Sequence, residues 1–247
     1  MNFTILRFDT LKSTNNEARD QAKVGAAEGL CIVARQQTAG RGRNGRNWVS
    51  EKDAGLFFSL VLRPKFELQH LPLITFAAGI AAFDSLASLG IEPDIKWVND
   101  VLVNGKKICG ILAETVETPK GTAVALGVGI NLRSYNFPQE IAEIATSIEA
   151  EALQRADPNT MLEKFNSRFS DIYDILSEPD GTAKILSLWT KRSTYEHGKQ
   201  VQINLEHEIF EGTTEGLEPN GALRVRTENG DLRIITAGDV KKLRSAN

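Results

Sequence analysis

The residues from Gly40 to Trp48 combine positive charge with backbone freedom in a way that suits an anionic ligand. Three glycines and three arginines occupy positions 40–46, and a tryptophan follows shortly after them. Glycine accepts a positive φ and lets the backbone approach a ligand closely. Arginine presents a permanent charge and a planar fork of donors that fits carboxylate or phosphate. We therefore expect a loop that closes over an anion, rather than an ordinary basic turn on the surface.

A second group of polar residues lies at 96–100, with the sequence Lys-Trp-Val-Asn-Asp. The pattern predicts a short strand that ends in an amide and a carboxylate just before a hairpin. Such side chains can hold ribose, phosphate or a magnesium-bound oxygen, and Lys96 can face phosphate. Taken alone, the pattern fits equally well a strand that merely has a polar end.

Glycine also interrupts two apolar strands, at 106–114 and at 127–132. A glycine within a strand indicates that something packs closely against the backbone. Alone, the first segment also fits an edge strand protected by lysine. The second, Gly-Val-Gly-Ile-Asn-Leu, opens no helix, so it is not a dinucleotide-binding fingerprint.

The elements that must position these groups follow from the periodicity of apolar residues. Thr14 and Glu17 have the spacing of a capping box at a helix start, and Asn104-Gly105 is typical of a type I′ hairpin turn. Strands are predicted at 3–8, 30–34, 55–62, 95–103, 106–116 and 122–132, the last one central, and helices at 14–23, 72–89, 161–177 and 183–195.

The pattern of apolar and polar residues changes after His197. Short alternating segments at 201–205, 223–227 and 232–236 are separated by tight turns at Asn220-Gly221 and Asn229-Gly230. This pattern predicts a small β-barrel. We therefore divide the chain into a larger domain, 1–195, and a small C-terminal domain, 196–247.

Composition narrows the class of protein. The net charge of −3 provides no global basic field for nucleic acid. The only cysteines, Cys31 and Cys109, lie in apolar segments with no CxxC pair, so we expect buried thiols rather than zinc ligands or a disulfide. The sequence contains no leader pattern and no apolar run of about 20 residues, so we expect a cytoplasmic protein that does not enter a membrane.

Together, these motifs closely resemble those of the biotin–protein ligase (biotin–[acetyl-CoA-carboxylase] ligase) family, across essentially the whole chain. The Ser-Thr-Asn of the family matches 13–15, and its Gln-x-x-Gly-Arg-Gly-Arg-x-Gly-Arg-x-Trp loop matches 37–48. Its Lys-Trp-Pro-Asn-Asp strand matches 96–100, except that Val98 replaces proline, which removes no functional group. Lys-x-x-Gly-Ile-Leu follows at 107 and Gly-x-Gly-Ile-Asn at 127.

The resemblance implies an α+β fold. Its first part would be a catalytic domain like those of class II aminoacyl-tRNA synthetases and biotin ligases, with a mixed β-sheet flanked by helices. Its second part would be a small C-terminal SH3-like β-barrel.

The resemblance also implies which residues bind the substrates biotin and ATP, and which act in catalysis. Arg43, Lys107 and Asp100 are the implied catalytic residues, and Asp100 is also a candidate ligand for Mg²⁺ that arrives with ATP. The implied binding residues are Ser13, Thr14, Asn15, Gln37, Arg41, Gly42, Arg43, Arg46, Trp48, Lys96, Asn99, Lys107, Gly110 and Asn131.

The implied reaction joins the biotin carboxylate to AMP with release of pyrophosphate, and then transfers biotin to a lysine of a carrier. The implied partner is a biotin carboxyl carrier protein or domain of acetyl-CoA carboxylase. Because Ser13 lies so close to the start of the sequence, we expect no helix-turn-helix domain and no repressor activity. A monomer and a homodimer both remain open.

Two other functions fit parts of the sequence. A lipoate or octanoate–protein ligase or transferase would share the fold, but its Arg-x-x-Gly-Gly-Gly-Ala signature is absent from the sequence. A nucleic-acid-binding protein could use the Gly/Arg loop, yet this run is single, lies between two predicted core strands and belongs to an acidic chain.

Overall fold

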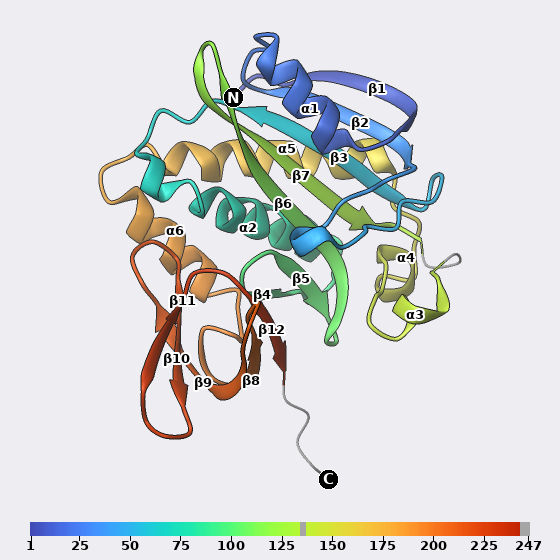
Figure 1. The fold of residues 1–247 in the computed structure, drawn as a ribbon. Helices are drawn as coiled ribbons and strands as arrows, with labels where there is room; N and C mark the ends of the chain where they lie inside the picture. The colour runs from blue at the N-terminus through green and yellow to red at the C-terminus, as the bar shows by residue number, and fades with distance from the viewer. Residues whose placement is uncertain (134–136, 243–247) are drawn as a thin grey trace.

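The computed structural model describes residues 1–133 and 137–242, and these form an α+β fold with two sheets (Figure 1). The larger sheet has the order β1-β2-β3-β7-β6-β5-β4. Among its strands only β1 and β2 pair in parallel, so the sheet is mixed, and β7 lies at its centre as predicted. The strands are β1 (Thr4–Leu11), β2 (Leu30–Gln37), β3 (Gly55–Leu62), β4 (Asp94–Lys96), β5 (Asp100–Val103), β6 (Lys106–Thr118) and β7 (Gly121–Asn131).

Helices cover both faces of this sheet. On one face α1 places Ala18 and Ala22 against Val61 of β3, while α2 and α5 cover the opposite face, where Phe58 packs. The alternation of side chains along β3 explains why one strand serves both faces. The helices are α1 (Thr14–Lys23), α2 (Leu73–Ala87), α3 (Gln139–Ala142), α4 (Ile148–Glu151), α5 (Pro158–Ile175) and α6 (Gly181–Thr190), with short 3-10 turns at Arg43–Gly45 and Leu68–His70.

The apolar helix α2 is a core helix of the larger domain. With the preceding 3-10 turn it has the length and composition of a membrane span, but most of it is buried between the sheet and the helices α5 and α6. Both cysteines are buried as well, and burial raises the pKa of each thiol to about 12. The prediction of buried thiols is confirmed.

The C-terminal residues form a separate five-stranded antiparallel sheet, with the order β11-β10-β9-β8-β12. This confirms the prediction of a small all-β unit. Its apolar face joins the main hydrophobic cluster of the molecule, for example through Val201, Leu223 and Val240. The strands are β8 (His197–Asn204), β9 (Ile209–Leu217), β10 (Leu223–Thr227), β11 (Leu232–Ile235) and β12 (Asp239–Lys242).

Most predicted elements are present, and the type I′ turn is confirmed by φ values of 51° at Asn104 and 77° at Gly105. The single strand predicted at 95–103 is wrong. The chain instead forms β4, a turn and β5, because the buried Trp97 lies in that turn and donates its Nε1–H to the carbonyl of Gly221 at 2.9 Å.

The predicted capping box is also wrong. Ser13, not Thr14, occupies the N-cap position of α1, and its side chain makes no capping bond. Thr14 is the first residue of α1, and its hydroxyl donates instead to Gln37 Oε1 at 3.1 Å. A tertiary contact has therefore replaced the local one that the spacing predicted.

The Gly/Arg loop, residues 40–48, leaves β2 and crosses in front of β6 and β7 (Figure 1). It is a small hairpin of its own. The amide of Gly42 donates to the carbonyl of Arg46 at 2.7 Å, and the amide of Trp48 donates to that of Gly40 at 2.9 Å. The fold thus holds this loop over the part of the sheet that α1 leaves uncovered.

Candidate functional site

Two paired glycines form the floor of a pocket beneath the Gly/Arg loop. Gly110 of β6 lies opposite Gly129 of β7. A Cβ on Gly110 would lie 2.7 Å from the Trp48 ring, and one on Gly129 would lie 2.5 Å from it. Glycine is required here because the indole lies directly on the two strands. The volume of this pocket is about 120 Å³.

One end of this pocket is a fixed polar network at the start of α1. Gln37 Oε1 accepts from the amide of Thr14 at 2.8 Å, and Gln37 Nε2 donates to Ser50 Oγ at 2.8 Å. The Ser59 hydroxyl lies 2.8 Å from that of Thr14. Ser13 and Thr14 are buried. These side chains are held rigidly, as a site for a neutral polar group requires.

Asn15 supports this end of the pocket. Its Oδ1 lies 2.7 Å from Ser59 Oγ, and its Nδ2 donates to the carbonyl of Leu112 at 3.2 Å and to Glu114 at 2.9 Å. A Cβ on Gly127 would lie only 2.3 Å from Asn15 Oδ1. Both polar atoms of Asn15 are therefore engaged by the protein itself.

The three arginines of the loop reach two strands and one turn. Arg41 pairs with Glu114 on β6, and Arg46 pairs with Asp239 on β12. Arg43 points to the turn before β5, where its Nη1 donates to the Oδ1 of Asn99 at 3.3 Å. Burial lowers the pKa of the Arg43 guanidinium, so this cation lies deeper in the molecule than an ordinary surface arginine.

A carboxylate lies between two lysines at the opposite end of the pocket. Lys107 Nζ is 2.6 Å from Asp100 Oδ1, and Lys96 Nζ is 3.6 Å from Asp100 Oδ2. Burial alone would raise the pKa of Asp100, but Lys107 and Lys96 outweigh it, and the pKa is lowered. Burial lowers the pKa of Lys96. Lys107 Nζ also lies 5.2 Å from the centre of the Trp48 ring, a cation–π distance.

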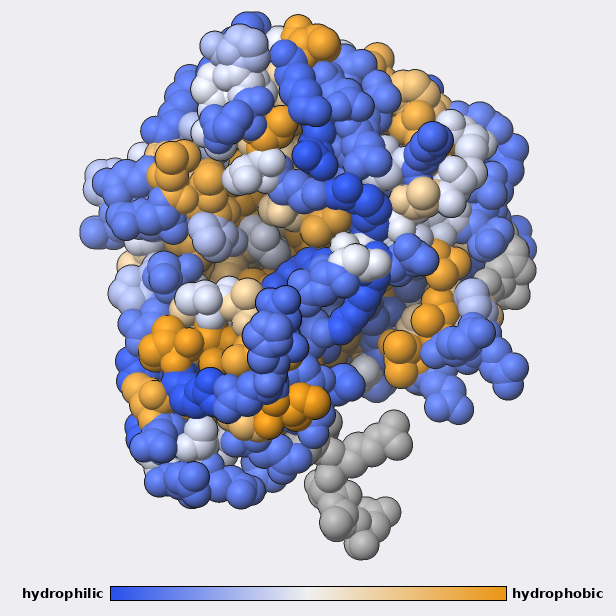
Figure 2. Space-filling view, in the orientation of Figure 1, coloured by the Kyte–Doolittle hydropathy of each residue, from blue (hydrophilic) through white to orange (hydrophobic). Residues whose placement is uncertain are grey.

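The first pocket opens into a second one of about 810 Å³, between the larger sheet, α3 and β12. Asn131 borders it, and its Nδ2 donates to the carbonyls of Thr146 at 3.0 Å and Lys107 at 3.3 Å. Hydrophobic residues lie at the surface over α3 and α4 (Figure 2), and Ile144 there is 61% exposed. The residues common to both pockets are Arg46, Asn47, Trp48, Asn99, Asp100, Lys107 and Asp239.

Every site residue named from the sequence lines at least one of the two pockets. Ser13, Thr14, Asn15, Gln37, Arg41, Gly42, Arg43 and Gly110 line the small one, Lys96 and Asn131 the large one, and Arg46, Trp48, Asn99, Asp100 and Lys107 both.

Sequence reasoning missed the apolar wall of the large pocket, which Phe137, Ile141 and Ile144 form. Only Ile141 lies within α3, a helix of four residues, so no periodic signal in the sequence marks this wall. Sequence reasoning also missed Glu114 and Asp239, the partners of Arg41 and Arg46.

The arrangement suits two ligands that meet. The small pocket offers neutral hydrogen-bonding groups at one end, an indole and two glycines along its length, and cations at its mouth. The large pocket adds an apolar wall next to the same cations. A molecule with a polar head, an apolar body and a carboxylate could lie in the first, with a second anionic molecule in the other.

Comparisons with known proteins agree with this description. Residues 7–131 match the model of the biotin/lipoate A/B protein ligase family, and residues 197–243 match the biotin protein ligase C-terminal domain. The chain is 35% identical over 234 residues to the bifunctional ligase/repressor BirA of Bacillus spizizenii, covering 93% of this chain and 71% of that protein.

It is 34% identical to the biotin–[acetyl-CoA-carboxylase] ligase of Paracoccus denitrificans, over 92% of this chain and 96% of that one. Among solved structures, the Aquifex aeolicus biotin protein ligase in complex with biotin and ATP superposes with a TM-score of 0.83. That pair is 28% identical and covers 98% of this chain and 99% of that one.

Proposed function

The chain belongs to the biotin/lipoate A/B protein ligase family, and from this membership we propose that it is an ATP-dependent biotin–[acetyl-CoA-carboxylase] ligase. The observation that carries the proposal is the position of two cations. Lys107 lies where the small pocket meets the large one, and Arg43 lines the small pocket and donates to Asn99, which borders both. The enzyme activates biotin as biotinyl-5′-AMP and then transfers biotin to a lysine of a carrier protein.

Biotin occupies the small pocket and ATP the large one. The ureido group of biotin is neutral and both donates and accepts hydrogen bonds, so it suits the network of Thr14 and Gln37. The apolar ring system then lies beside Trp48, and the carboxylate reaches the cationic end. The adenine of ATP is assigned to the apolar wall of Phe137, Ile141 and Ile144.

The first step brings two anions together, because the biotin carboxylate attacks the α-phosphate of ATP. Arg43 and Lys107 offset the repulsion and stabilise the charge that develops on phosphate as pyrophosphate leaves. Asp100 holds Lys107 at 2.6 Å and so orients its ammonium group. The loop then shields the adenylate from water until a carrier arrives.

Transfer requires that the acceptor lysine attack as a neutral amine. Asp100 is a weak base because its pKa is lowered, so we assign it to the orientation of Lys107 and Lys96 rather than to proton removal.

Magnesium enters with ATP as part of the substrate, and the phosphate oxygens supply most of its ligands. Among residues 1–133 and 137–242, no three His, Cys, Asp or Glu side chains cluster as a metal site. The two ammonium groups beside Asp100 make its carboxylate a poor partner for a resident cation.

The remaining assignments complete the proposal. The acceptor is the biotin carboxyl carrier protein or domain of acetyl-CoA carboxylase, and the enzyme is cytoplasmic. The chain acts as a catalytic domain, 1–195, and a C-terminal domain, 196–247, either as a monomer or as a homodimer.

The proposal is tested by biotin-dependent release of pyrophosphate from ATP. Arg43→Ala should lower the rate at least about 100-fold, the scale of losing one donor to the transition state. Arg155→Ala is the control, because that arginine is 80% exposed and lines neither pocket. Unchanged release in Arg43→Ala, or release that does not depend on biotin, would reject the proposal.

A mass shift in a carrier domain after incubation with the protein, biotin, ATP and magnesium tests the second step. Replacing biotin by lipoate in the same assay separates the proposed ligase from its nearest relatives. Modification with lipoate alone would favour that alternative.

A further inference from the structure

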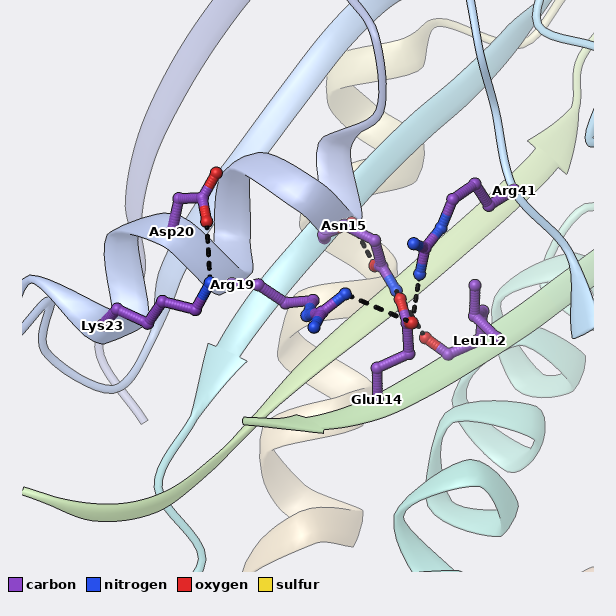
Figure 3. Close-up of polar contacts among 8 residues, drawn as sticks. Asn15, Arg19, Asp20, Lys23, Arg41, Leu112 and Glu114 are labelled. Carbon is purple, nitrogen blue, oxygen red and sulfur yellow. Dashed lines mark hydrogen bonds and ion pairs between the residues drawn. The ribbon is translucent and has the colours of Figure 1, made fainter. Parts of the chain in front are cut away.

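Glu114 of β6 gathers donors from two segments that are far apart in the sequence (Figure 3). Asn15 Nδ2 donates to its Oε2 at 2.9 Å, and Arg41 of the Gly/Arg loop donates to its Oε1. Arg19 of α1 approaches the same Oε1 to 3.7 Å. One carboxylate thus joins α1, β6 and the loop.

This cluster lies in a partly enclosed environment. The side chain of Glu114 is 23% exposed, and those of Arg41 and Arg19 are 35% and 32% exposed. A charge-assisted hydrogen bond between such groups is shorter and stronger than one between neutral groups. The contact therefore restrains the loop more than an exposed surface pair would.

Because of the position of Arg41, its contact with Glu114 restrains the whole loop hairpin. Arg41 is the first arginine of the loop hairpin, and it forms a bridge with Asn47 one residue before Trp48. An anchor on Arg41 therefore fixes both strands of the hairpin, including the indole on Gly110 and Gly129. Arg43 on the same hairpin points instead toward Asn99, at the junction of the pockets.

We propose that Glu114 is a positioning residue that holds the Gly/Arg loop closed over the small pocket by binding Arg41. Arg41 then serves as the anchor of the lid, and Arg43 is the arginine that faces phosphate. These roles of Arg41 and Arg43 rest on the proposed ligase activity, because the ligand that the closed Gly/Arg loop retains is biotinyl-5′-AMP.

The test measures how fast preformed biotinyl-5′-AMP leaves the full-length protein in the absence of a carrier, after a chase with unlabelled biotin. Glu114→Gln keeps an oxygen for Asn15 but removes the charge that holds Arg41. Release should become about tenfold faster, the equivalent of about 1.4 kcal/mol, while KM for ATP stays unchanged. Glu117→Gln is the matched control, because Glu117 is an exposed glutamate on the same strand.

Two further variants separate positioning from general damage. Arg41→Gln combined with Glu114→Gln should release the adenylate no faster than Arg41→Gln alone, because both remove one interaction. Arg41→Lys, which keeps a cation opposite Glu114, should release the adenylate at a rate within about threefold of the wild type. Release from Glu114→Gln at the wild-type rate, or additive effects in the double variant, would overturn the inference.

Hydrogen exchange in the ligand-free protein gives a readout that does not depend on activity. The amides of Gly42 and Trp48, which are bonded within the loop, should exchange faster in Glu114→Gln and in Arg41→Gln than in the wild type. Arg41→Gln leaves β6 intact, so it tests the contact even where Glu114→Gln folds poorly. Unchanged exchange in Arg41→Gln refutes the anchor, whereas a wild type without adenylate formation refutes only the proposed function.

Discussion

At the scale of single residues, the most constrained group is Asp100. Two ammonium groups share this one carboxylate, and the side chain of Asp100 is only 17% exposed. Removing the carboxylate would leave Lys96 and Lys107 facing each other without a counter-ion, and burial already disfavours the charged form of Lys96. Asp100 therefore stabilises the fold as well as the arrangement of the site.

We expect Asp100→Asn to lower the free energy of unfolding by about 2 kcal/mol at neutral pH, measured by urea denaturation. The lowered pKa of Asp100 sets the pH dependence. Its contribution is complete above the ordinary pKa of the carboxyl, 3.8, and is lost as pH falls through the lower folded-state value. The difference between variant and wild type should thus stay constant near neutrality and shrink only in acid.

Asp171→Asn, a change at an exposed position on α5, serves as the control. A difference between Asp100→Asn and the wild type that grows as the pH falls would contradict the assignment.

Sequence motifs predicted which residues meet at this scale, but not what each of them does. Asn15 was expected among the ligand-binding residues, whereas its polar atoms are engaged by Ser59, Leu112 and Glu114. The roles of Glu114 and Asp239 as partners of Arg41 and Arg46 could not be predicted, because an isolated acidic residue forms no local sequence pattern. Their partners lie 73 and 193 residues away in the chain, and only the fold brings them together.

At the scale of elements, a glycine in strand β7 and a glycine in helix α2 have opposite effects on stability. In β7, Gly127 makes room for Asn15, since a Cβ at this position would lie only 2.3 Å from the amide oxygen. In α2, a Cβ on Gly79 would lie 3.5 Å from Ile95, which is an ordinary contact. The first glycine is needed for packing, and the second only weakens its helix.

We expect Gly79→Ala to raise the free energy of unfolding by about 0.5–1 kcal/mol, because alanine restricts the unfolded chain and favours the helix. Gly127→Ala should lower it by about 1–3 kcal/mol and should also weaken biotin binding, since Asn15 must move. Thermal denaturation of both variants with and without biotin provides the measurement. A stabilising Gly127→Ala would show that Asn15 is not held as described.

Long elements with a clear period could be predicted from the sequence, and short or tertiary ones could not. The Asn104-Gly105 hairpin and the strand 55–62 follow from local chemistry, because turn residues specify the first and an apolar run interrupted only by Ser59 specifies the second. The break between β4 and β5 depends on the contact of Trp97 with Gly221, 124 residues away. The helices α3 and α4, of four residues each, are too short to produce a periodic signal.

At the scale of the whole molecule, the two sheets share one hydrophobic cluster. Ile95 and Trp97 belong to it together with Val201 and Leu223 of the C-terminal sheet. Gly221 packs so closely that a Cβ there would lie 2.9 Å from Phe76 of α2. The C-terminal sheet is therefore part of the same packed interior and not a loosely tethered module.

We expect the protein to unfold in a single calorimetric transition, with equal calorimetric and van't Hoff enthalpies, because separate unfolding would expose the shared cluster. Trp97→Phe removes the bond to the Gly221 carbonyl and should lower the stability of that one transition by about 1–2 kcal/mol. Two resolved transitions in the wild type would refute this coupling.

The placement of Trp48 gives the molecule a built-in optical probe. Of the three tryptophans, Trp97 and Trp189 are buried in the hydrophobic interior, and only Trp48 lines the small pocket. Its indole lies beside the ammonium group of Lys107, so its excited state senses the field that any bound anion would alter. The largest change in intrinsic fluorescence on titration with biotin would therefore originate at the loop itself, with no dye attached.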